Sequence, residues 1–360
     1  MKILFGVQAT GNGHITRARA LNRYLKESDI QTDFLFSGRR KEKFFDMDEF
    51  GDWRCHEGLT FVHEAGELKF LRTLQRNSIG KLIGDISKLK LKDYDLILTD
   101  FEPITAWAAR LKGKPCLGIG HQYAFNHKVP CRGDTWLGRA VMKNFAPAAN
   151  SLGLHWHHFG QPILPPIAET HQSKAPCDPN KIIVYLGFED TAKVIEMLEP
   201  FEDHLFVFYG PFTSYETRGH ILLKPLSREG FKQDLATSSG VICNAGFELS
   251  SEAIQLGKKL LVKPLMGQVE QLSNSRALEE LGLAKTMDSL DNQVVGEWLR
   301  DWHAKRVVYP DVARALVNWI GEEQWKKKHA VKQLAYQLWS EVEASGVDSF
   351  DTPLPFGQLA

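Results

Sequence analysis

Short apolar runs alternate with amphipathic segments along this chain, and the whole alternation occurs twice. In the first half the runs fall at 3–7, 34–36, 96–99 and 116–119. In the second half they fall at 182–186, 205–208, 221–223, 241–243 and 260–262. Continuous apolar runs joined by helices are typical of parallel strands that are buried on both faces. The pattern therefore predicts an α/β protein with two doubly wound, Rossmann-like domains facing each other across a cleft.

A proline-rich, aperiodic segment separates the two alternations and predicts a linker over 164–180. The first domain is then expected at 1–163 and the second at 181–321. A further helix and a loose tail are expected at 322–360. Two domains also agree with the length of 360 residues, at about 150 residues per domain.

Composition excludes several classes of protein. The 44 basic residues balance 44 acidic ones, so the overall field that nucleic-acid binders use is absent, and no nucleic-acid partner is expected. No apolar run approaches the roughly 20 residues that cross a bilayer. Five scattered cysteines with no CxxC pair indicate a reducing compartment. These features predict a cytoplasmic protein.

The first motif with chemical content is Gly11-Asn12-Gly13-His14-Ile15-Thr16-Arg17, which follows the first predicted strand and opens a helix. Glycines there let a ligand approach the backbone, and the free amides at the helix start favour anions. The motif lacks the third glycine of the dinucleotide fingerprint and the Gly-Lys-Ser/Thr of a P-loop. His14 is well placed to act as a general base. The alternative is a helix-capping turn in which His14 is merely solvated.

Asp100 ends another strand of the same predicted sheet, in Leu98-Thr99-Asp100-Phe101-Glu102-Pro103. The carboxyl ends of parallel strands lie at one edge, so Asp100 is expected near His14, where it could orient the imidazole. It could equally be the N-cap of the helix that follows. His121 and Gln122 follow the next strand and are expected at the same cleft edge.

The most specific motif lies in the second half and reads strand, glycine turn, helix, strand, proline loop, helix. Its members are Asn244, Ala245, Gly246, Phe247, Glu248, Ser251, Glu252, Gly257, Pro264, Gln268, Gln271 and Asn274. Glycine at 246 permits a tight passage beside a diphosphate. The carboxylate of Glu252 suits vicinal ribose hydroxyls, and the paired amides of Gln271 and Asn274 suit the hydroxyls of a sugar.

This block resembles the donor-nucleotide motif of GT-B glycosyltransferases, notably the lipid II-forming N-acetylglucosaminyltransferase, the UDP-glycosyltransferases and the prokaryotic glycosyltransferase-related proteins. Gly11-Asn12-Gly13-His14 is similar to their amino-terminal Gly-x-Gly-His. The resemblance implies an inverting sugar transfer from a nucleotide diphosphate donor, typically UDP-linked, to a carbohydrate, lipid-linked or small-molecule acceptor. No cofactor or metal is implied.

The resemblance also implies a role for each matching residue. His14 would be the base and Asp100 its orienting carboxylate. The acceptor side would comprise Gly13, Arg17, His121 and Gln122. The donor nucleotide would be held by Gly187, Leu226, Gly246, Phe247, Glu252 and Gln271, with the backbone near Leu226 reading the base.

Two features of the sequence depart from that family pattern. Glu248 and the acidic loop 187–190 bring negative charge to the expected diphosphate site, and Lys224 or Arg228 are candidates to compensate it. Arg17 completes a Gly-His-x-x-Arg sequence that resembles nucleotide-sugar hydrolases of the same fold. A hydrolase or epimerase, and a non-catalytic nucleotide-sugar-binding protein, are therefore the alternatives.

Two smaller features carry expectations of their own. The basic amphipathic stretch 69–92 is a candidate for peripheral contact with anionic lipid at the inner membrane face, or a solvated helix face over a buried stripe. His155-Trp156-His157-His158 lacks an acidic or cysteine partner at ligand spacing, so no metal site is expected there.

Overall fold

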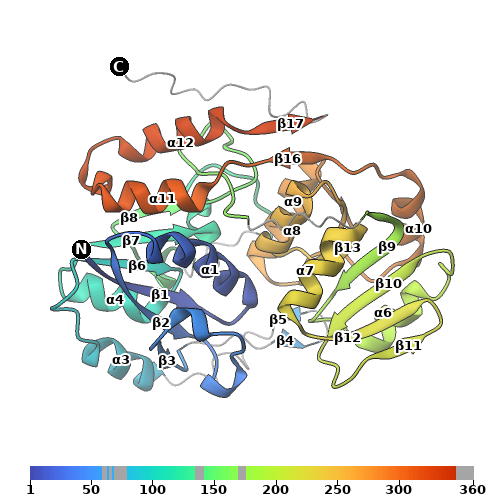
Figure 1. Ribbon diagram of the computed structural model, residues 1–360, viewed down its shortest axis with the longest axis horizontal. Helices are drawn as coiled ribbons and strands as arrows, with labels where there is room; N and C mark the ends of the chain where they lie inside the picture. The colour runs from blue at the N-terminus through green and yellow to red at the C-terminus, as the bar shows by residue number, and fades with distance from the viewer. Residues whose placement is uncertain (59–62, 65–66, 69–78, 134–141, 169–175, 346–360) are drawn as a thin grey trace.

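The computed structural model describes residues 1–58, 63–64, 67–68, 79–133, 142–168 and 176–345. The first domain is built on a six-stranded sheet in the order β3-β2-β1-β6-β7-β8 (Figure 1). All five pairings are parallel. Its strands are β1 Lys2–Gln8, β2 Gln31–Ser37, β3 Arg54–His56, β6 Leu96–Asp100, β7 Cys116–Gly120 and β8 Asn150–Gly153. A separate antiparallel pair consists of β4 His63–Glu64 and β5 Glu67–Leu68.

The second domain has a seven-stranded sheet in the order β11-β12-β10-β9-β13-β14-β15. Only its edge pairing, β11 with β12, is antiparallel. The strands are β9 Asp178–Tyr185, β10 Leu205–Gly210, β11 Glu216–Arg218, β12 Ile221–Pro225, β13 Ser238–Asn244, β14 Lys259–Lys263 and β15 Lys285–Thr286. Without the short edge strand and the β4–β5 pair, both sheets have the order 3-2-1-4-5-6 of a doubly wound fold. The predicted fold class is therefore confirmed.

Helices cover both faces of each sheet because successive strand residues point to opposite faces. In the first domain Leu4 and Ile97 face α3 and α4, whereas Ile3 and Phe5 face α1. In the second domain one face packs on α6 and α10, and the other on α7, α8 and α9. These helices are α1 Asn12–Lys26, α3 Ile79–Lys88, α4 Pro103–Leu111, α6 Thr191–Leu198, α7 Arg228–Thr237, α8 Phe247–Gln255, α9 Val269–Glu280 and α10 Asn292–Asp301. Short 3₁₀ turns are η1 Lys41–Lys43, η2 Asp48–Phe50, η3 His121–Asn126 and η4 Gln324–Lys326.

The carboxyl-terminal segment returns to the first domain. Helices α11 Val312–Gly321 and α12 Ala330–Ser340 lie beside that domain, and α11 packs against α1 (Figure 1). The indole of Trp339 donates a 2.6 Å hydrogen bond to the carbonyl of Ile163. Between the two helices and the second domain, β16 Arg306–Val308 pairs with β17 Glu343–Ser345. The sequence assigns 312–321 to the second domain, but an amphipathic pattern does not say which domain covers the apolar face.

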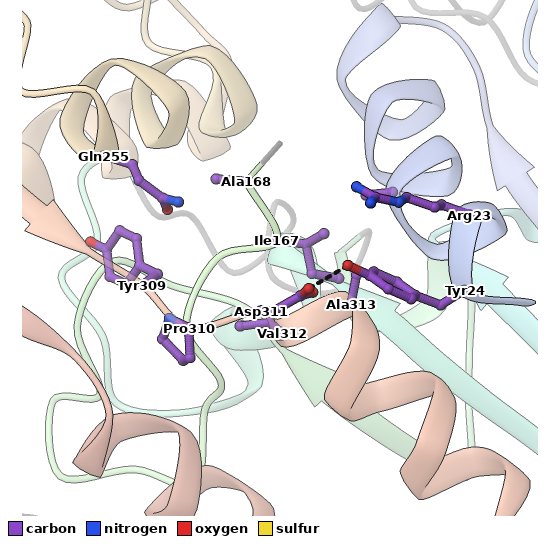
Figure 2. A pocket seen from close by; sticks show the side chains of 11 residues that line it. Arg23, Tyr24, Ile167, Ala168, Gln255, Tyr309, Pro310, Asp311, Val312 and Ala313 are labelled. Atoms are coloured by element: carbon purple, nitrogen blue, oxygen red, sulfur yellow. Dashed lines mark hydrogen bonds between the residues drawn. The ribbon is translucent and has the colours of Figure 1, made fainter. Parts of the chain in front are cut away.

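A cavity of about 280 Å³ lies where the chain crosses between the domains (Figure 2). It is bordered by the linker at Ile167 and Ala168, by the returning segment 309–313, and by the carboxyl-terminal half of α1. The hydroxyl of Tyr24 donates a hydrogen bond to Asp311 across it. None of the predicted catalytic or binding residues lines this cavity.

Candidate active site

The predicted catalytic residues lie at the point where the strand order of the first sheet reverses. Strand β1 has β2 on one side and β6 on the other, so the loops after β1 and β6 leave in opposite directions and open a crevice. Val7 near the end of β1 is in register with Asp100 at the end of β6. His14 follows in the first turn of α1, which brings the two functional side chains to one edge of the sheet.

His14, Asp100 and Arg17 form one hydrogen-bonded group. His14 Nδ1 lies 2.8 Å from Oδ1 of Asp100. Arg17 donates to both carboxylate oxygens of Asp100, from Nε at 2.8 Å and from a terminal nitrogen at 2.7 Å. That same terminal nitrogen is 3.0 Å from His14 Nδ1. Asp100 is fully buried, so its charge depends on these two partners.

The alternative role of Asp100 as a helix cap is not what the structure shows. Glu102 is the N-cap of α4, and its carboxylate accepts hydrogen bonds from the amides of Ile104 and Thr105. Since the helix begins at Pro103, a cap must lie immediately before it, and Asp100 is too far back in the chain. Asp100 is therefore left to pair with His14 and Arg17.

The charges around His14 oppose the effect of burial on its pKa. Burial lowers the pKa of His14, but the charge and hydrogen bond of Asp100, with help from Glu248, raise it above its usual 6.5. Burial likewise raises the pKa of Asp100, but Arg17 and then His14 outweigh this and leave it below 3.8. Asp100 is therefore an anion at neutral pH that stabilises protonated His14.

The second domain reaches this group through two carboxylates. Arg17, with a side chain only 1% exposed, donates a hydrogen bond to Glu248 at the start of α8. Gln122 donates at 3.1 Å to Glu270 of α9, and its amide nitrogen is also 3.4 Å from His14 Nε2. Burial raises the pKa of Glu270, and the nearby charge of Glu248 adds to this rise. Both contacts join residues of the first domain to residues of the second.

A buried stack of aromatic rings from the two domains lies beside these contacts. The ring of His121 stacks on Phe247 with centroids 4.0 Å apart and an interplanar angle of 8°. Its Nε2 lies 2.6 Å from Oδ1 of Asn274, whose amide nitrogen donates to the carbonyl of Ala245. The expectation that Asn274 offers its amide to a sugar is corrected here, because both ends of that amide bind protein atoms. Trp156 adds a 2.9 Å hydrogen bond to Ser251.

The predicted donor-side residues fall into an open group and a buried group. Gly246 is the N-cap of α8, has no side-chain cap, and faces open space where a Cβ would lie. Gly187 after β9 also faces open space, and Leu226 after β12 is 44% exposed. In contrast, Glu252 and Gln271 are buried. The side-chain carbonyl of Gln271 accepts a 3.0 Å hydrogen bond from the amide of Leu265, which fixes the loop before α9.

Glu248 and Glu189 are paired with cations, but not with those that the sequence suggests, and Asp190 is the N-cap of α6. Lys224 pairs with Asp234 at 2.7 Å, and Arg228 pairs with Glu49 of the first domain at 3.1 Å. Glu189 of the loop after β9 is instead held by Lys263 at 2.8 Å, both side chains being nearly buried.

Several solved structures that share this architecture are glycosyltransferases. The glycosyltransferase SnogD from Streptomyces nogalater is 16% identical with a TM-score of 0.54, over 93% of this chain and 98% of that chain. MurG from Acinetobacter baumannii is 14% identical with a TM-score of 0.51, over 94% and 99%. Arabidopsis thaliana UGT89C1, solved with UDP, is 13% identical with a TM-score of 0.53, over 94% and 98%. These likenesses show the GT-B fold that the sequence predicts.

A family assignment follows from the sequence itself. No curated protein sequence matches the chain. The family described as "Glycosyl transferase family 1" does, over residues 1–302. The chain belongs to this family. It is therefore a glycosyltransferase.

Three residues of this glycosyltransferase site were missed or misjudged from the sequence. Glu270 is adjacent to Gln271 inside the quoted motif, but only the three-dimensional structure brings it to Gln122. Lys263 is the last residue of β14, which pairs with β13, and the loop after β13 leads into α8. Its position at the end of a strand is the only feature of the sequence that indicates a role in the site. The sequence presents Glu248 as an unfavourable charge at the expected diphosphate site, whereas the structure pairs it with Arg17.

Other features of this glycosyltransferase bear on metals and membranes. In the described residues, no group of three or more histidine, cysteine or acidic side chains is arranged to hold a metal. His155 and His157 pack among aromatic rings, the first against His121 and the second against Phe159. No helix within the described ranges is long and apolar enough to cross a membrane. Of the stretch 69–92, residues 69–78 lie outside the described residues, and α3 carries the exposed Ile79 and Ile83.

Proposed function

We propose that this glycosyltransferase moves a sugar from a UDP-linked donor to an acceptor hydroxyl with inversion at the anomeric carbon. The observation that carries the proposal is the pair of His14 and Asp100, 2.8 Å apart, at the carboxyl edge of the first sheet and joined through Arg17 to the start of α8. The base of one domain then lies opposite the helix start of the other, which is the arrangement that a direct displacement needs.

In this mechanism His14 is the general base. With its Nδ1 proton donated to Asp100, the lone pair of the neutral imidazole is at Nε2, the nitrogen that faces Gln122. Nε2 takes the proton of the acceptor hydroxyl while the acceptor oxygen bonds to the anomeric carbon. The bond from that carbon to the diphosphate breaks, and its electron pair leaves with the diphosphate. General-base assistance of this kind contributes about 10²–10⁴ in rate, and Asp100 stabilises the imidazolium that forms.

The donor is proposed to lie on the second domain. The amides in the first turn of α8 suit the departing diphosphate, since Gly246 gives this helix no side-chain cap and has open space where a Cβ would lie. Gly187 and Phe247 would border the diphosphate, Glu252 the ribose, Gln271 the sugar, and the backbone near Leu226 the base. This leaving-group stabilisation does not call for a metal, so we predict that EDTA leaves the activity unchanged.

The acceptor is proposed to lie on the first domain, near Gly13, Arg17, His121 and Gln122. A carbohydrate, a lipid-linked sugar or a small molecule would each present the required hydroxyl. Exposed Ile79 and Ile83, with Lys81 and Lys88 on the same helix, support peripheral contact of a cytoplasmic enzyme with anionic lipid. Sedimentation with vesicles containing anionic lipid, compared with an Ile83→Glu variant, tests that contact.

The proposal is tested by measuring UDP release from a panel of UDP-sugars, with and without candidate acceptors, for the wild type and His14→Ala. Acceptor-dependent release that falls at least 100-fold in the variant is the expected result. Rapid formation of UDP and free sugar without any acceptor would instead establish a nucleotide-sugar hydrolase. Binding of UDP with no turnover, unchanged in His14→Ala, would establish a non-catalytic binder.

A further inference from the structure

Glu248 connects the second domain to the hydrogen-bonded group around His14. It lies in the first turn of α8 in the second domain, and its carboxylate reaches a side chain of the first domain, Arg17. Its own side chain is 15% exposed, whereas that of Arg17 is 1% exposed. A carboxylate at this helix start departs from the family pattern, so its position calls for a reason specific to this chain.

The first domain accommodates Glu248 at one particular position. A Cβ on Gly13 would lie 2.6 Å from Oε2 of Glu248, which is closer than real Cβ contacts allow. Glycine at 13 therefore leaves room for the carboxylate beside the first turn of α1. The same glycine lies one residue before His14, so Glu248 docks next to the proposed base.

Arg17 passes the effect of Glu248 on to His14. Two of its nitrogens bind Asp100, and the third binds Glu248, so the guanidinium has a carboxylate from each domain. Without Glu248, one nitrogen of a buried arginine would lack a partner, which is costly for a group removed from water. Contact with Glu248 thus favours the rotamer of Arg17 that also holds Asp100 against His14.

We propose that Glu248 is a positioning residue, which completes the Arg17–Asp100–His14 arrangement only when the two domains are closed. The inference rests on the proposed role of His14 as base. It implies that the base reaches its working state only after the donor domain has closed, which limits proton abstraction in the open enzyme. Glu248 acts through Arg17 and is not itself a reacting group.

The charged and polar groups that face His14 determine in which direction its pKa is expected to change when Glu248 is replaced. From its own helix Arg17 disfavours the imidazolium, and from β6 Asp100 favours it. From α8 Glu248 also favours the imidazolium, and Glu270 of α9 faces the same group through Gln122. His121 lies nearby, and burial lowers its pKa to about 4, so it is neutral. Replacing Glu248 by glutamine removes one favourable charge and leaves Arg17 less neutralised. Both changes lower the pKa of His14.

The experiment follows the titration of His14 by NMR of histidine-labelled protein, with His14→Gln used to assign the signal. In Glu248→Gln the midpoint moves to lower pH than in the wild type, and Glu248→Asp, which keeps the charge, restores part of the shift. Gly13→Ala, which pushes the carboxylate aside, shifts the midpoint in the same direction. Glu280→Gln, at an exposed pair on α9, is the matched control and leaves it unchanged.

The kinetic readout is the acid limb of the pH profile. For Glu248→Gln, kcat/KM at pH 8 falls about tenfold or more, as expected for loss of a charge-assisted hydrogen bond, and the limb moves to lower pH. An unchanged His14 midpoint in Glu248→Gln, or the same shift in Glu280→Gln, overturns the inference whatever reaction is catalysed. Full activity in His14→Ala would overturn the proposed function, while the titration still reports on Glu248.

Discussion

Replacing Asp100 with asparagine removes the charge that compensates Arg17 while keeping the shape of the side chain. Both side chains are 1% exposed, and two hydrogen bonds of 2.8 and 2.7 Å join them. Breaking a buried pair by removing one partner costs about 3–5 kcal/mol. We expect the lower end, about 3 kcal/mol, because Glu248 still neutralises part of the charge of Arg17.

The assay is thermal unfolding of Asp100→Asn and wild type at pH 7.5. A loss of about 3 kcal/mol lowers the Tm by roughly 6–12 °C for domains of this size. The control is Glu216→Gln, which breaks an exposed pair with Arg218 and should leave the Tm nearly unchanged.

The pH dependence gives a second check on the same variant. The pKa of Asp100 is lowered in the folded state, so its stabilisation is fully present above about pH 4 and is lost as the pH falls further. The gap between variant and wild type should widen as the pH falls from 8 through the raised pKa of His14, because Asp100 stabilises the imidazolium, and it should narrow below about pH 4. Equal unfolding temperatures at pH 7.5 would refute the account of Asp100 as the buried counter-charge.

Three other measurements test the structure. His14→Gln should lower kcat by a factor of about 10²–10⁴. Because the pKa of His14 is raised in the folded protein, its contribution to stability is present below pH 6.5 and is lost as the pH rises through that raised pKa. Unfolding of the variant and the wild type across pH 5–9 would show this. Gly153→Ala places a Cβ 2.6 Å from backbone of η3 and should cost about 1–3 kcal/mol, whereas Gly84→Ala on α3 meets no atom and should gain up to about 1 kcal/mol. Lys263→Met strands the carboxylate of Glu189 and should cost about 3 kcal/mol, most of it recovered in the double variant with Glu189→Gln; additive losses in that cycle would contradict the pairing.

Local pattern was enough to predict the two sheets and the meeting of His14 with Asp100. Runs buried on both faces indicate parallel strands, and parallel strands place their carboxyl ends at one edge. The position of Glu102 just before Pro103 is also a local signal for a helix N-cap. Glu102 was therefore a better candidate for that cap than Asp100, two residues earlier.

Pairings between residues that are far apart in the chain could not be predicted in this way. Arg17 and Glu248 are 231 positions apart, and their contact depends on how two separately folded domains are oriented. Lys263 reaches Glu189 because β13 lies between β9 and β14, with the two carboxyl ends at one edge. Sequence shows the charge of each residue, but not which opposite charge lies within reach.

The return of α11 and α12 to the first domain gives the molecule two covalent crossings in place of one. Both border the same cavity, one at Ile167 and Ala168 and the other at 309–313 (Figure 2). Two chain connections side by side oppose twisting and sliding of one domain against the other. Rotation about a single hinge axis is then the motion that they restrict least. Each cycle of opening and closing would then bring the same faces together, so that His14 meets the second domain in the same orientation each time.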